Sequence, residues 1–101
     1  MNWSDMFMAT LRRSRFGMAD MASVNMNKAD LTYSYLVDAN MERSTLKFAN
    51  LEFADFSGAI MTCVDLTGAL LHKANFTNAD LRGSTFSSEE MKKAITIGAI
   101  F

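Results

Sequence analysis

Cys63 and His72 carry the side chains that most often act in catalysis, and each is the only residue of its type in the chain. A thiol and an imidazole can work as a nucleophile and its base when the fold holds them within hydrogen-bond distance. The same two residues cannot bind zinc alone, because a zinc site needs three or four protein ligands. Whether Cys63 and His72 can meet depends on the elements that carry them.

Those elements follow from one apolar pattern. Every fifth residue from Met1 to Met91 is Leu, Met or Phe. This period matches neither the helical rotation of about 100° per residue nor the strand rotation of about 180°, so the chain must turn at every repeat. Two positions earlier, from Ser4 to Ser84, the residue is always Ala, Ser or Val, and the residue between is often Asp or Asn, as in Ala29-Asp30-Leu31. Short polar side chains suit turns, so each repeat predicts a short extended side followed by a corner.

Over residues 4–88 the chain resembles the pentapeptide-repeat family, whose signature is Ala-Asp/Asn-Leu-X-X. The resemblance implies an all-β fold, a right-handed quadrilateral β-helix in which four repeats make one coil. The small and the large residue of each repeat would both point inward. A chain of this length would then form about four coils.

The four-repeat coil can be checked within the sequence, because residues twenty positions apart should stack in one column. The Ser and Val residues at the small position fall into two of the four columns, and the other two columns contain only Ala. Two columns of large residues are the predicted core ladders: Met21, Met41, Met61 and Leu81, and Phe16, Leu36, Phe56 and Phe76.

The coil separates the two candidate catalytic residues. Cys63 and His72 lie two repeats apart and therefore on opposite sides of the square, with the core between them. We expect Cys63 to be an exposed free thiol and the methionine column to fill the core rather than bind a soft metal. The sequence thus predicts no catalytic residue, no metal site, no cofactor and no enzymatic activity.

The charge and composition of the chain indicate which classes of partner it can bind. The formal net charge is −1, and Arg12, Arg13 and Arg15 are the one local excess of positive charge, which we interpret as a solvated patch. We therefore expect no direct nucleic-acid binding. No segment is long and apolar enough to span a membrane, and a single cysteine fits a reducing bacterial cytoplasm. A fragment of a secreted bacterial effector stays open as an alternative.

Both ends predict special roles. We divide the chain into an N-terminal edge (1–3), the β-helix (4–88), and a C-terminal capping helix with an apolar tail (88–101). Ser87-Ser88-Glu89-Glu90 has the form of a capping box that opens a helix covering the last coil. The tail either folds back under this helix or forms a homodimer seam, and Trp3, Phe7 and Met8 offer a second contact surface at the first coil. The candidate dimer or cap residues are Met91, Ile95, Ile97, Ile100 and Phe101.

Function must then lie on outward residues. Tyr33 and Phe53 should share one exposed column, with Phe48 at the neighbouring corner and Glu52 beside it. These four residues form the candidate interaction strip, although an aromatic ladder can also serve to stabilise paired coils. The sequence favours a non-enzymatic protein-interaction or scaffold module with an unknown protein partner. The alternative is a mimic of duplex DNA that binds or protects gyrase, as in some members of the family it resembles, based on an excess of acids within residues 29–68.

Overall fold

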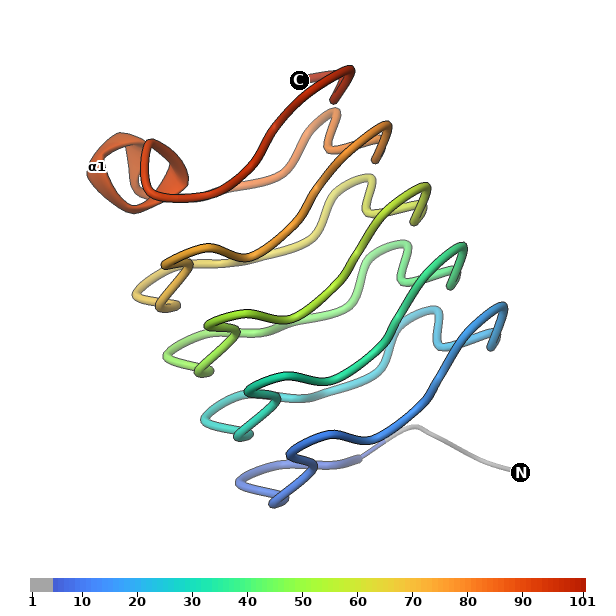
Figure 1. The fold of residues 1–101 in the computed structure, drawn as a ribbon. Coiled ribbons are helices and arrows are strands. Elements are labelled where there is room, and N and C mark those ends of the chain that lie inside the picture. Colours follow the sequence, from blue (N-terminus) through green and yellow to red (C-terminus); the bar gives the residue numbers. More distant parts are fainter. Residues whose placement is uncertain (1–4) are drawn as a thin grey trace.

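The chain winds into a stack of nearly square coils (Figure 1). The structure, a computed structural model, describes residues 5–101, so the expected edge at 1–3 and Trp3 lie outside the described residues. Its extended segments are single parallel bridges that run from Asp5↔Asn25 to Asp80↔Ile100. Each bridge joins residues twenty apart, which is the register that the sequence predicts.

Hydrogen bonds between coils explain the polar position of the repeat. The Met41 N–H donates to the Ile60 carbonyl at 2.8 Å, and the Arg43 N–H donates to the Thr62 carbonyl at 2.9 Å. The N–H of the residue between them, Glu42, donates instead to the Asn40 side chain at 3.1 Å. The same bond recurs at each Asp or Asn in this position, because a short side-chain oxygen reaches the N–H two residues later.

The interior is filled by the predicted core ladders, all of which are buried. The rings of Phe56 and Phe76 stack with centroids 5.2 Å apart. Two hydroxyls in the core are satisfied locally, since Ser34 donates to the Leu31 carbonyl at 2.6 Å and Ser44 donates to the Met41 carbonyl at 2.8 Å. The core is therefore a dry axis of large apolar side chains surrounded by small ones.

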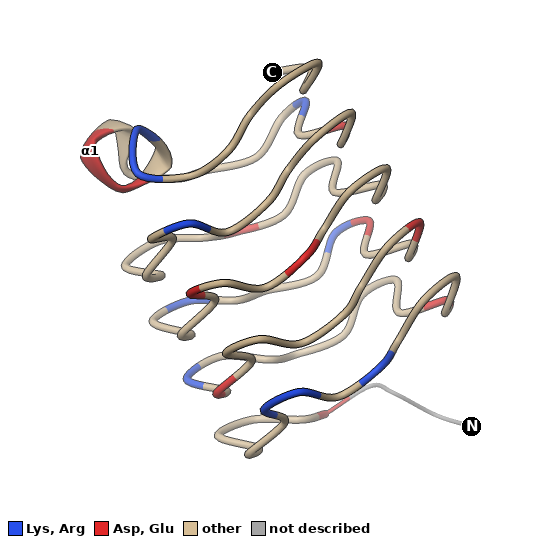
Figure 2. Ribbon diagram, in the orientation of Figure 1, with Lys and Arg blue, Asp and Glu red and all other residues tan. Residues whose placement is uncertain are grey.

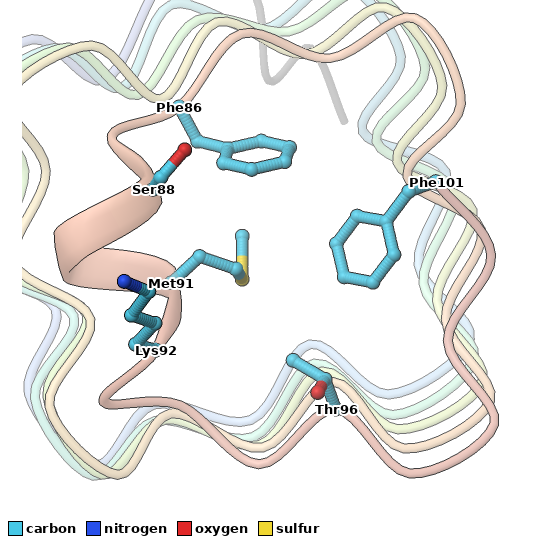
Figure 3. Close-up of a pocket in the computed structure, with 6 residues that line it drawn as sticks. All are labelled: Phe86, Ser88, Met91, Lys92, Thr96 and Phe101. Atoms are coloured by element: carbon cyan, nitrogen blue, oxygen red, sulfur yellow. The ribbon is translucent and has the colours of Figure 1, made fainter.

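The C-terminal helix differs from the sequence prediction. Helix α1 (Ser88–Met91) begins as expected, with the Ser87 side chain accepting from the Glu90 N–H at 3.3 Å. However, the helix ends after one turn and takes the place of one side of the last coil (Figure 1). Met91 points inward from it (Figure 3). The prediction that it covers the end of the coil is therefore wrong.

The expected apolar tail also differs, because it re-enters the coil. Ile95 bridges to Asn75 and Ile100 bridges to Asp80, so residues 94–101 continue the ladder after the helix. Ile95 still lies twenty residues after its partner, and the helix therefore adds no residue to the coil. The β-helix extends through residue 101 instead of stopping at 88, and the tail does not fold back under the helix.

Candidate interaction surface

Many outward side chains of this fold are carried by its corners. From Met8 to Gly83 the last residue of each repeat adopts a positive φ, for example 60° at Tyr33, 59° at Phe48 and 60° at Phe53. Such a conformation favours Gly, and four corners have one. At the other corners a side chain lies outside the core and points along its column, as Cys63 does where its Sγ lies beside Gly83. Exposed side chains of one corner column therefore lie next to one another in successive coils.

One corner column holds a continuous aromatic stack. The rings of Tyr33 and Phe53 are parallel within 3°, with centroids 4.8 Å apart, and both side chains are exposed. The Arg13 guanidinium lies over the other face of Tyr33, with Cζ 5.3 Å from the centroid. His72 meets Phe53 edge to face at 5.7 Å. The sequence predicts the pairing of Tyr33 and Phe53, but Arg13 and His72 were not predicted to join them. Arg13 could have been placed there, because it stands one coil before Tyr33 in the same register.

The remaining strip residues lie beside this stack. Phe48 is 61% exposed at the neighbouring corner, and its ring occupies the space that a Cβ on Gly68 would need. Glu52 precedes Phe53 and is half-buried. One side of the square therefore presents aromatic rings at both of its corners, with a carboxylate between them.

A second apolar surface occurs at the C-terminal end of the core. Phe86, Met91 and Phe101 point into the square section together with Thr96, and a hollow of about 320 Å³ lies among them (Figure 3). Thr96 occupies a position where earlier repeats carry Leu, Met or Phe, so it fills less space. Outside the hollow, the side chains of Ile97 and Ile100 are 73% and 51% exposed.

Charges are dispersed over the coils (Figure 2). Two acids of the 29–68 region form ion pairs, Asp30 with Arg12 at 3.8 Å and Asp65 with Lys47 at 3.7 Å. The pKa of each of these carboxyls is lowered, chiefly by a hydrogen bond from the hydroxyl two residues later. The other acids of this region occupy different columns, so no single acidic track forms among the described residues.

The two candidate catalytic residues have different surroundings: Cys63 occupies a corner, whereas His72 precedes the corner at Lys73. Cys63 is an exposed free thiol beside Gly83, whereas His72 packs against Phe53. Among residues 5–101, no three His, Cys, Asp or Glu side chains gather into a group that could hold a metal ion. Within the same residues, no helix is long and apolar enough to cross a membrane.

A family model described as pentapeptide repeats, with eight copies, matches residues 25–62 and 49–87. The chain is a pentapeptide-repeat protein. Pentapeptide-repeat proteins fold as right-handed quadrilateral β-helices, in agreement with the square coils and the register of bridges seen here. The resemblance found in the Ala-Asp/Asn-Leu repeats is thereby confirmed.

Solved structures of other pentapeptide-repeat proteins are similar in fold. One from the thylakoid lumen of Arabidopsis thaliana is 21% identical, with a TM-score of 0.64, over 97% of this chain and 61% of that one. A trypsin-treated form of QnrB1, a plasmid-mediated fluoroquinolone resistance protein, is 19% identical, with a TM-score of 0.50, over 85% of this chain and 51% of that one. No curated protein matches the sequence. The chain thus spans about half to three fifths of these structures, and the likeness concerns the fold alone.

Proposed function

We propose that this pentapeptide-repeat protein is a non-enzymatic interaction module that binds a protein partner through the strip Tyr33, Phe48, Glu52 and Phe53. The observation that carries the proposal is the exposed stack of Tyr33 on Phe53, with Phe48 at the next corner of the same side. Aromatic side chains offer large, rigid contact areas and are enriched among the residues that dominate binding energy at protein interfaces.

Affinity capture with paired variants tests this proposal. The variant Tyr33→Ala/Phe48→Ala/Phe53→Ala removes the exposed rings, and Ile60→Ala removes an exposed apolar side chain from the opposite side of the square. We expect the strip variant to lose a partner that the wild type and Ile60→Ala both retain. Equal recovery by all three proteins would exclude the strip, and a lost partner counts only if thermal unfolding shows that the triple variant is folded.

The C-terminal end supports a second interaction, the association of two copies. Ile97, Ile100 and Phe101 are exposed around the hollow at the end of the core, and exposed apolar surface of this kind is typical of contact sites. We propose that two chains pair through this end to form a homodimer. The first coil, where Phe7 and Met8 are also exposed, is the competing site.

A further inference from the structure

Three arginines lie around the corner that carries the aromatic stack. Arg13 occupies the corner itself, with a φ of 60°. Arg12 precedes it on one side of the square, and Arg15 bridges to Tyr35 on the adjoining side. All three side chains are exposed, and Figure 2 shows this basic cluster in the first coil. The coil therefore presents three guanidinium groups toward the solvent beside Tyr33 and Tyr35.

The cluster has more positive charge than its surroundings neutralise. Among residues 5–101, Arg12 has an ion-pair partner, Asp30 at 3.8 Å, and no carboxylate lies within ion-pair distance of Arg13 or Arg15. The next acids in the columns of Arg12 and Arg15 are Glu52 and Asp55, two coils away. Elsewhere Arg82 and Lys93 contact carboxylates at 2.7 and 2.6 Å.

The stack also orders one of these arginines. The guanidinium of Arg13 lies over Tyr33, which in turn stacks on Phe53. A guanidinium that lies over a ring can still use its N–H groups to bind a carboxylate in a bidentate manner. Less side-chain entropy is then lost when a carboxylate binds Arg13.

We propose that the corner formed by Arg12, Arg13, Arg15, Tyr33 and Tyr35 binds an acidic, extended segment of a partner protein. Carboxylates of that segment would pair with Arg13 and Arg15. Arg15 and Tyr35 line a hollow of about 300 Å³ that offers space for an acidic side chain. The inference rests on the proposed interaction function and adds to it the chemistry of the partner.

The geometry of Tyr33 favours an acidic peptide over single-stranded nucleic acid as the occupant. Proteins that bind single strands stack bases on the open faces of aromatic rings. Phe53 stacks on Tyr33 and the Arg13 guanidinium lies over the same ring, so the Tyr33 ring offers no open face to a base. An acidic peptide needs only the guanidinium edges and the ring edges, and these remain exposed.

Fluorescence anisotropy with a labelled, short polyglutamate peptide tests the proposal on the full chain. The variant Arg13→Gln/Arg15→Gln removes two charges from the cluster, and Arg43→Gln removes one charge from the diagonally opposite corner, where φ is 61°. We expect the double variant to weaken binding by about tenfold or more, since hydrogen bonds to charged groups are strong. Arg43→Gln should bind as the wild type does. Raising the salt from about 0.1 M to about 0.3 M should also weaken wild-type binding, because it shortens the screening length.

Several outcomes would overturn the inference. These are no binding of the peptide by the wild type, equal losses for the double variant and Arg43→Gln, or tighter binding of a labelled oligothymidine than of the peptide. Capture of the partner separates this inference from the proposed function. If the double variant retains a partner that the strip variant loses, the acidic-segment inference fails while the interaction function stands.

Discussion

Asn50 illustrates how a single side chain completes a repeat. Its backbone N–H donates to the Ala29 carbonyl at 3.0 Å and its carbonyl accepts from Leu31 at 2.8 Å, so the backbone ties two coils together. Its side-chain oxygen accepts from the Glu52 N–H at 3.1 Å. Asp and Asn are predicted from the sequence to form turns, but only the structure shows that each accepts from the N–H two residues later.

Two substitutions of Asn50 should therefore show how much its side-chain hydrogen bond contributes to the free energy of unfolding. We expect Asn50→Ala to lower the free energy of unfolding by about 1 kcal/mol, because the Glu52 N–H loses its acceptor. Asn50→Asp should be close to the wild type, since a carboxylate oxygen accepts the same bond. Urea unfolding measures both differences, and an alanine variant as stable as the aspartate variant would contradict this role.

Substitutions of Leu51 test whether the core is closed to water. Leu51 is fully buried, so Leu51→Asp places a carboxylate where water cannot reach it, which costs several kcal/mol even when the carboxylate is protonated. We expect this variant not to fold, whereas Leu51→Met should lose less than about 1.5 kcal/mol. Circular dichroism and thermal unfolding distinguish the two. A folded Leu51→Asp protein would show that this position is not inside the coil.

Helix α1 shows, at the scale of an element, how the coil tolerates a departure from its repeat. From Met6 to Leu81 the N–H of each other large apolar residue donates to a backbone carbonyl of the next coil, but the Leu71 N–H donates to the Glu90 side chain at 3.1 Å. The second carboxylate oxygen of Glu90 accepts from Lys93 Nζ at 2.6 Å. The Glu90 carboxylate thus accepts the hydrogen bond that a backbone carbonyl accepts at the equivalent position of the preceding coils.

Glu90 should make the stability depend on pH. The ammonium of Lys93, and then the Leu71 N–H, hold the pKa of this carboxyl below its ordinary value of 4.5. A lowered pKa in the folded state means that the contribution is complete above the pKa of the unfolded chain and is lost as pH falls through the folded value. We expect Glu90→Gln to reduce the free energy of unfolding at neutral pH, with the difference from wild type shrinking below about pH 4.5.

The matched control for this prediction is Glu89→Gln, because the exposed Glu89 also contacts a lysine of the same turn, at 3.4 Å. Urea unfolding at several pH values should show little change for Glu89→Gln. An equal and pH-independent loss in both variants would contradict a specific role for Glu90.

The ends of the chain mark how far the sequence could predict its elements. The five-residue pattern predicts the square coil and its core, because each repeat states which side chains point inward. The capping box predicts the start of α1 from Ser87 and Glu90. The pattern could not predict that Ile95 and Ile100 rejoin the ladder, because Thr96 breaks the apolar period there, and the rejoining depends on carbonyls and N–H groups of the preceding coil.

At the scale of the whole molecule, the twenty-residue register places residues that are far apart in the sequence side by side on the surface. Tyr33 and Phe53 could be paired from the sequence, since they stand twenty residues apart. The contact of His72 with Phe53 could not be predicted, because it joins neighbouring columns and depends on the orientation of the two side chains. The same holds for the hollow at the end of the core, because Met91 and Phe101 line it only as the chain passes through α1 and rejoins the coil.

Self-association is the prediction that belongs to the whole molecule. If two chains pair through the C-terminal end, Ile97→Lys/Ile100→Lys should shift the protein from dimer to monomer in sedimentation experiments. Ile60→Lys is the control, because Ile60 shares a column with Ile100 and is similarly exposed, at 46% against 51%. If the double variant remains a dimer, the C-terminal end is not the contact, and the first coil becomes the site to test.

The most direct test of the twenty-residue register, on which both proposed surfaces depend, is a disulfide across adjacent coils. Neighbouring coils lie about 4.8 Å apart, which is within the Cα separation of about 4.4 to 6.8 Å that a disulfide bridges. In a Cys63→Ser background, Tyr33→Cys/Phe53→Cys should close to an intramolecular disulfide under mild oxidation, as measured by loss of free thiols. Tyr33→Cys/Phe48→Cys, which joins two different corners, should keep its thiols. Closure of the second pair with the first left open would contradict the register and, with it, both surfaces.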